Sequence, residues 1–190
     1  MYLIKRLQNI LLSPKMEWLA IKREALTVAQ IYGKYLLVFA ALPSAGYLLS
    51  FIGTPNFIAA LRLAIISYVV WLLTFNFATV IVDLLAPTFA SKRNINYAFR
   101  LVSFSLVPML TAGLLSFIPV LGLILYVIGA AYSAYVCYYG LPVLLQTPED
   151  KVVPYTVTTI VTVLIIYFVI MIVLGIIFGV SLRQFFSWSF

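Results

Sequence analysis

Five long apolar stretches dominate this 190-residue chain, at residues 35–52, 63–85, 101–118, 120–141 and 155–180. Each is close to the roughly 20 residues of helix that cross the hydrocarbon core of a bilayer. The connections between them are too short to hold a soluble catalytic domain. The sequence therefore predicts an all-α fold, a polytopic integral membrane bundle of five transmembrane helices.

The composition supports a membrane protein. Hydrophobic residues make up 65% of the chain and charged residues only 9%, whereas about a quarter of the residues in soluble domains are charged. We expect one bundle at residues 35–190, preceded by a cytoplasmic amphipathic or interfacial segment at residues 1–34. The net charge of +7 comes from basic residues that flank the spans. Because they form no basic face, we expect no nucleic-acid partner.

The basic residues also predict the orientation. Ten of the twelve lie before the first span, between spans two and three, or between spans four and five, and only Arg62 and Arg183 lie on the opposite side. Segments rich in lysine and arginine are retained in the cytoplasm. We therefore expect a cytoplasmic N-terminus and, with five spans, a C-terminus outside.

Residues 2–12 predict an amphipathic surface helix. Its apolar residues share one helical face: Leu3, Leu7, Ile10 and Leu11. Such a helix lies on the membrane surface, with Lys5 and Arg6 near anionic head groups. Ser13 and Pro14 then predict a second helix, because proline suits the first helical position. Whether these helices only anchor the chain to the bilayer or have a further role is left open by the pattern.

The second span carries a stripe of polar residues. Asn76, Thr79 and Asp83 fall on one helical face, and Asp83 is the only acidic residue within a span. An acid at this depth is expensive unless it is paired or hydrated. One hypothesis is an ion, proton or ligand site, and the other is an ion pair near the cytoplasmic interface. The basic residues within reach are Lys92, Arg93 and Arg100.

A cluster of tyrosines marks the fourth span. Tyr132, Tyr135 and Tyr139 share a helical face, and Tyr138 lies beside them. Tyrosine buries a large ring while keeping a hydroxyl available for hydrogen bonds. The cluster is consistent with packing and a cytoplasmic aromatic belt, or with a hydroxyl-lined site inside the bundle.

Small residues predict close helix packing on the fifth span. Gly175 and Gly179 form a GxxxG pair, which lets helix backbones approach where lipid supplies no hydrophobic drive for association. The pair is compatible with packing inside the chain or with a homo-oligomer.

The usual catalytic motifs are missing. The chain has no histidine, a single cysteine at Cys137, and neither a GxxxxGK[ST] nor a GxGxxG motif. The absence of histidine excludes a Ser-His dyad and a histidine-based zinc site. We therefore expect no catalytic residues, no metal site, no cofactor and no enzymatic activity.

Five motifs carry a resemblance to a known family. In chain order they are SPKMEW at 13–18, DLLAPTF at 83–89, YAFRLVSFS at 97–105, YVCYYGLP at 135–142 and TPEDK at 147–151. In this order on five spans they resemble prokaryotic members of the Ypt-interacting-protein (Yip) domain family. The resemblance covers nearly the whole chain.

The resemblance implies a small five-span bundle with a cytoplasmic N-terminus, in the cytoplasmic membrane of a prokaryote. Eukaryotic relatives are associated with small GTPases and membrane traffic. This chain departs from them because it lacks their long polar tail and has Ala90 and Ser91 where relatives often have glycines, which weakens the case for GTPase binding. We expect a non-enzymatic protein that organises the membrane or binds protein partners. The alternative is a small ion, proton or solute conduit that uses the Asp83 stripe.

Overall fold

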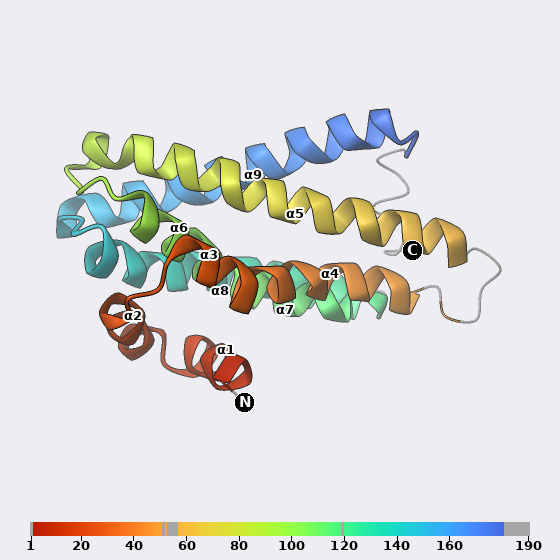
Figure 1. Cartoon of the computed structure of the whole chain (residues 1–190), viewed down its shortest axis with the longest axis horizontal. Helices are drawn as coiled ribbons and strands as arrows, with labels where there is room; N and C mark the ends of the chain where they lie inside the picture. The colour runs from red at the N-terminus through yellow and green to blue at the C-terminus, as the bar shows by residue number, and fades with distance from the viewer. Residues whose placement is uncertain (1, 51, 53–56, 119, 181–190) are drawn as a thin grey trace.

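The computed structural model describes residues 2–50, 52, 57–118 and 120–180, and this part of the chain is helical (Figure 1). The α-helices of the N-terminal half are α1 (Tyr2–Leu12), α2 (Pro14–Arg23), α3 (Val28–Ile31), α4 (Leu37–Ser50) and α5 (Phe57–Leu85). Those of the C-terminal half are α6 (Ile95–Ser105), α7 (Val107–Leu114), α8 (Leu121–Leu144) and α9 (Glu149–Ile177). The shorter turns are the π-helical η1 (Tyr32–Leu36) and the 3₁₀ turns η2 (Ala86–Phe89) and η3 (Leu115–Phe117).

Four helical segments are long and apolar enough to cross a membrane. They are Phe57–Phe89, Ile95–Phe117, Leu121–Leu144 and Glu149–Ile177. The predicted first span, 35–52, is not confirmed, because α4 has only 14 residues where a crossing helix needs roughly 20. However, α3, η1 and α4 follow one another directly, and Figure 1 shows α4 running alongside α5 and α7. The all-helical membrane fold is therefore confirmed, while the count of five spans stays a prediction.

The segment of the third predicted span is broken into two helices. Helix α6 ends at Ser105 and α7 begins at Val107, because Pro108 has no backbone N–H to continue the hydrogen-bond ladder of α6. The neighbouring helix compensates, since the backbone N–H of Met109 donates to Ser133 Oγ at 3.2 Å. A Cβ on Gly129 would lie 2.9 Å from Ala112 Cβ, so this glycine allows α8 to pack closely against the break.

The broken span forms the centre of the bundle. Of its most apolar window 83% is buried, compared with 17% for α9. The largest fully buried side chains around it are aromatic: Tyr35, Phe39, Trp71, Phe75 and Phe104. Helix α9 instead exposes a row of valines, isoleucines and phenylalanines along its length. An exposed apolar surface of this extent suits contact with lipid.

The basic connections gather at one end of the bundle, where α2 also lies (Figure 1). The backbone N–H of Lys92 donates to the Leu145 carbonyl at 2.8 Å, which ties the α5–α6 connection to the end of α8. The basic residues at this end belong to α2, to the α5–α6 connection and to the first turn of α9: Lys15, Lys22, Arg23, Lys92, Arg93 and Lys151. In the described part of the chain, the opposite end of α5 carries Arg62. The charge asymmetry that the sequence predicts is therefore present in three dimensions.

The GxxxG pair does not form a helix-packing motif. Helix α9 ends at Ile177, and Gly179 lies beyond it with a φ of 61°. The Val180 N–H donates to the Gly175 carbonyl at 2.7 Å and the Gly179 N–H to the Ile176 carbonyl at 3.2 Å, which is the bonding of a Schellman helix end. Gly179 is needed for this left-handed position, so only Gly175 remains on the helix.

Candidate functional site

Helices α1 and α2 form a hairpin, here called the arm, and a buried polar cluster lies between these two helices. Arg6, on α1, is only 3% exposed and pairs with Glu17 of α2 and with Glu24 just beyond it. Asn9 donates a 2.8 Å hydrogen bond to the second oxygen of Glu17. The cluster therefore joins the two helices of the arm through charge and hydrogen bonds.

Arg6 also contacts the bundle. Its guanidinium carbon is 5.7 Å from the ring centroid of Tyr35 and 5.8 Å from that of Phe104, within the range of cation–π attraction. Burial alone would lower the pKa of Arg6, but the hydrogen bond to Glu24, that to Tyr35 and the charge of Glu17 outweigh it, so the pKa is raised. Arg6 therefore stays charged inside the protein.

The expected contact between Arg6 and lipid head groups has to be corrected. A side chain that is enclosed by two glutamates and two aromatic rings cannot reach a membrane surface. Ile10, predicted on the lipid face of α1, is also buried, and Leu7 packs against the same core, while the Leu3 side chain lies outside the described part. Lys5 is exposed, and its contact with head groups stays a prediction.

Arg100 fastens the arm to the centre of the bundle. It lies on α6, is 5% exposed, and donates to the carbonyls of Ile21 at 2.7 Å, Glu24 at 2.8 Å and Leu26 at 2.5 Å. The last carbonyls of a helix have no intrahelical partner and carry partial negative charge. The buried Arg100 guanidinium therefore supplies hydrogen bonds to these carbonyls, and their partial negative charge compensates its positive charge.

The tyrosine cluster on α8 contacts the arm through Tyr132 and Tyr139, while Tyr135 and Tyr138 are exposed. Its ring centroids lie 5.4 Å apart for Tyr132 and Tyr135, 4.8 Å for Tyr135 and Tyr139, and 5.2 Å for Tyr138 and Tyr139. The Tyr132 hydroxyl donates to the Leu11 carbonyl at 2.8 Å, in the last turn of α1. The Lys15 ammonium lies 4.5 Å from the Tyr139 ring centroid. The contacts of Tyr132 and Tyr139 agree with the packing role that the sequence favoured, and a place in the aromatic belt stays a prediction for the exposed Tyr135 and Tyr138.

Trp18 is the main apolar anchor of the arm. It is 1% exposed, and its indole N–H donates to the Val136 carbonyl at 2.9 Å. A Cβ on Gly140 would lie 2.8 Å from the indole ring and 2.5 Å from Leu101. The glycine therefore creates the space into which the tryptophan packs.

The structure pairs Asp83 with Arg93. Arg93 donates to Asp83 Oδ2 from Nε at 3.1 Å and from Nη2 at 2.9 Å. The carboxylate is largely buried, but the Arg93 side chain is 54% exposed, so the pair lies at the margin of the bundle. Asp83 Oδ1 is buried without a hydrogen-bond partner among the described residues. Arg100 bonds to the arm and not to Asp83. The predicted polar site is therefore divided between the margin of the bundle, where Asp83 lies, and the attachment of the arm.

The other members of the stripe make mostly local bonds. Thr79 donates to the Phe75 carbonyl one turn earlier, a bond that many threonines in membrane helices make. Asn76 is exposed and bonds to the Leu72 carbonyl and to the Tyr32 hydroxyl. The stripe therefore contains an exposed amide, a back-bonded hydroxyl and a paired carboxylate, which do not converge on one another.

Sequence reasoning missed the acidic partners of Arg6. A signal was present, because the chain has only five acidic residues and two of them, Glu17 and Glu24, occur in the short N-terminal segment. They are seven residues apart, close to two helical turns. In a chain with so few charged residues, acids close to an arginine in the sequence favour an internal ion pair.

The span-capable helices and the docked arm define an all-helical integral membrane protein. The sequence matches the Yip1 domain over residues 9–187, and the chain therefore belongs to the Yip1 domain family. This match confirms the resemblance seen in the motifs. No curated protein and no solved structure gave a match.

Proposed function

We propose that this protein is a non-enzymatic membrane-organising protein whose arm inserts as a wedge into one leaflet. The observation that carries the proposal is the polarity of the arm. Its charged cluster faces inward, around Arg6, while large apolar side chains face outward: Ile4, Leu12, Met16 and Leu19. Leu12 is 81% exposed and Met16 is 70% exposed. The transfer of such side chains from water to the acyl chains lowers the free energy of the system.

The charges around the arm favour an anionic lipid surface as its partner. Lys5, Lys15 and Arg23 are exposed on the arm, and Lys92 is exposed on the neighbouring connection. Each such charge contributes about 1 kcal/mol near an anionic membrane. Apolar insertion together with basic contacts is typical of interfacial helices. We place this end of the bundle in the cytoplasm, in the cytoplasmic membrane of a prokaryote.

The rigidity of the arm makes it suited to act on the bilayer. Arg100, Trp18 and Tyr132 hold it to three places in the bundle through hydrogen bonds. A fixed wedge adds area to one leaflet and so stresses the bilayer, whereas a flexible tether does not transmit that stress.

The test is to reconstitute the full chain in anionic vesicles and measure vesicle diameter by electron cryomicroscopy. We expect the wild type to shift vesicles to smaller diameters than protein-free controls at matched lipid content. The variant L12Q/M16Q/L19Q should lose this shift, because all three side chains are exposed and the fold does not depend on them. The matched control L12I/M16L/L19I keeps the apolar surface and should retain the shift.

A depth measurement separates lipid insertion from protein binding. A spin label at Met16→Cys, in a Cys137→Ser background, should be accessible to oxygen and protected from a water-soluble relaxation agent. Equal vesicle diameters for wild type and the glutamine variant, with the label exposed to water, would overturn the proposal. That result would favour a protein partner for this surface instead.

A further inference from the structure

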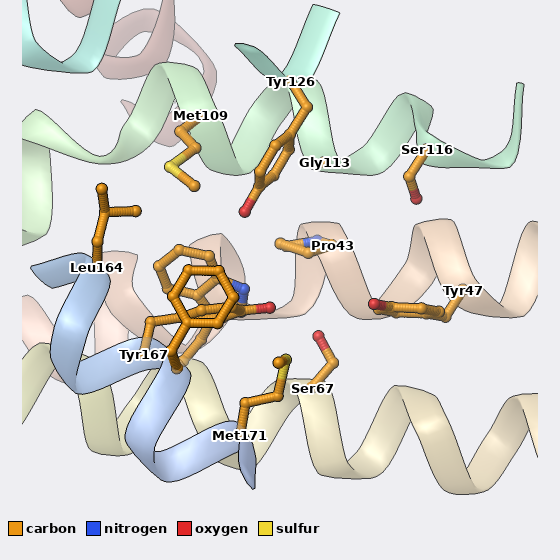
Figure 2. Close-up of a pocket in the computed structure, with 12 residues that line it drawn as sticks. Pro43, Tyr47, Ser67, Met109, Gly113, Ser116, Tyr126, Leu164, Tyr167 and Met171 are labelled. Atoms are coloured by element: carbon orange, nitrogen blue, oxygen red, sulfur yellow. The ribbon is translucent and has the colours of Figure 1, made fainter. Parts of the chain in front are cut away.

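A cavity of about 100 Å³ lies inside the bundle, away from the arm. Figure 2 shows it between α4, α5, α7, α8 and α9, with side chains from each helix directed toward it. Ser67 lies ten residues after Phe57, where α5 begins, and therefore about 15 Å along that helix. The cavity is thus at a depth where the surrounding solvent is hydrocarbon.

Hydroxyl groups converge on this cavity. Tyr47, Tyr126, Tyr167 and Ser67 project into the same space (Figure 2). They come from α4, α8, α9 and α5, respectively. No charged residue lines the cavity in the part of the chain that the structure describes. The site therefore offers hydrogen bonds without a compensating charge.

Ser67 has a hydroxyl for which the described residues supply no partner. It is 2% exposed, and its Oγ makes no hydrogen bond to any described residue. Five other hydroxyls of the spans bond to the carbonyl four residues earlier: Ser44, Thr74, Thr79, Thr111 and Thr156. Ser103, Ser105 and Thr159 are also buried without a hydrogen bond to a described residue, but they do not line the cavity. An unsatisfied buried hydroxyl is unfavourable. Its direction into the cavity indicates that an occupant supplies the missing bond.

The cavity is shaped by close contacts between α4 and α7. A Cβ on Gly113 would lie 3.1 Å from the Pro43 ring, and one on Gly46 would lie 2.5 Å from the Gly113 carbonyl. The two glycines therefore let the helices approach on one side. On another side, Leu164 and Phe168 line the cavity and are also exposed on α9. These two side chains therefore lie between the cavity and the lipid-facing surface of α9.

We propose that this cavity binds the hydroxyl end of a neutral, single-chain lipid, a long-chain alcohol or a monoacylglycerol. An ionised head group is disfavoured because the lining has no opposite charge and charges are expensive at this depth. The volume is sufficient for a few heavy atoms, since a water takes about 30 Å³ and an engineered cavity of about 150 Å³ holds benzene. The alkyl chain leaves past Leu164 and Phe168 into the bilayer. This proposal does not rest on the wedge function of the arm.

Photolabelling of the full chain in vesicles tests the proposal. The probe is a long-chain alcohol that carries a diazirine beside its hydroxyl, and the labelled residues are identified by mass spectrometry. We expect labelling around Met109 and Met171, both of which line the cavity. Excess unlabelled alcohol or monoacylglycerol should compete with the probe, and an alkane of the same length should not.

Paired variants identify the hydrogen bonds. Ser67→Ala and Tyr126→Phe should each lower the labelling about fivefold, the effect of one neutral hydrogen bond. Thr74→Val is the matched control, because its hydroxyl on the same helix bonds to the Val70 carbonyl, and labelling should not change. If the alkane competes with the probe as well as the alcohol does, the labelling reports ordinary annular lipid and the proposal is overturned. Unchanged labelling in both hydroxyl variants would lead to the same conclusion. Absence of labelling would show a cavity that holds water only.

Discussion

The guanidinium of Arg100 donates a 2.7 Å hydrogen bond to the carbonyl of Ile21, 79 residues earlier in the chain. This bond connects the most buried span to the arm that lies outside the bundle. It makes a charged side chain in a membrane protein part of the arm's attachment. The first prediction follows from this role.

Arg100→Gln should release the arm. The substitution removes the charged donor to the carbonyls of Ile21, Glu24 and Leu26. Hydrogen bonds from charged groups contribute about 1.5–3 kcal/mol, so hydrogen exchange of the α2 amides should accelerate roughly 10- to 150-fold. Mass spectrometry of the detergent-solubilised protein measures this rate. Arg23→Gln, at an exposed site on the same helix, should leave it unchanged.

Arg6→Met should be strongly destabilising because it leaves the carboxylates of Glu17 and Glu24 without their partner. Removing one side of a buried ion pair costs about 3–5 kcal/mol. The triple variant R6M/E17Q/E24Q should recover much of this loss, since no buried charge remains unpaired. Thermal unfolding in detergent compares the two. If the triple variant is less stable than R6M, the three side chains do not act as one ionic cluster.

Gly140→Ala should weaken the docking of Trp18. The added methyl group would lie 2.8 Å from the indole and 2.5 Å from Leu101, and overpacking of this kind costs about 1–3 kcal/mol. Limited proteolysis of the arm should therefore become faster. Gly33→Ala is the matched control, because a Cβ there meets nothing within 4 Å. Equal proteolysis of the two variants would mean that the Trp18 contact is not tight.

Asp83→Asn distinguishes a structural ion pair from a conduit. Because Arg93 is half exposed, we expect a modest loss of stability, about 0.6–2 kcal/mol, measured by thermal unfolding. Wild-type vesicles should show no flux of protons or common cations above empty vesicles. If the wild type does conduct, and Asp83→Asn abolishes the flux at unchanged melting temperature, the conduit hypothesis is correct and ours is wrong.

Labelling of the termini tests the orientation and the number of spans together. Residues 181–190 lie outside the described part of the chain, so the position of the C-terminus is still a sequence prediction. In a Cys137→Ser background, Ser189→Cys should react with an impermeant reagent from outside the cell, and an N-terminal tag should be accessible only from the cytoplasm. Labelling of Ser189→Cys from the cytoplasmic side would mean that the α4 segment does not cross the bilayer.

Local patterns in the sequence were enough to predict several elements. The apolar runs predicted the four helical segments that are long and apolar enough to span a membrane, and proline correctly marked the start of α2 at Pro14. The asymmetry of basic charge and the ordered motifs gave the basic end and the family. These features depend on residues close together in the chain, where helix periodicity and the length of a bilayer crossing limit the possibilities.

The partners of the charged residues were decided only by the tertiary structure. Three basic residues are within reach of Asp83 in the sequence. In the structure Arg93 binds Asp83, whereas Arg100 binds the carbonyls of the arm. Arg6 was expected at the lipid surface, but the folding of α1 against α2 places it between two acids. Ser67 and the three tyrosines that share its cavity come from four different helices. In an apolar environment a polar group bonds to whichever partner the packing brings near, and long-range packing is not encoded in the local pattern of residues.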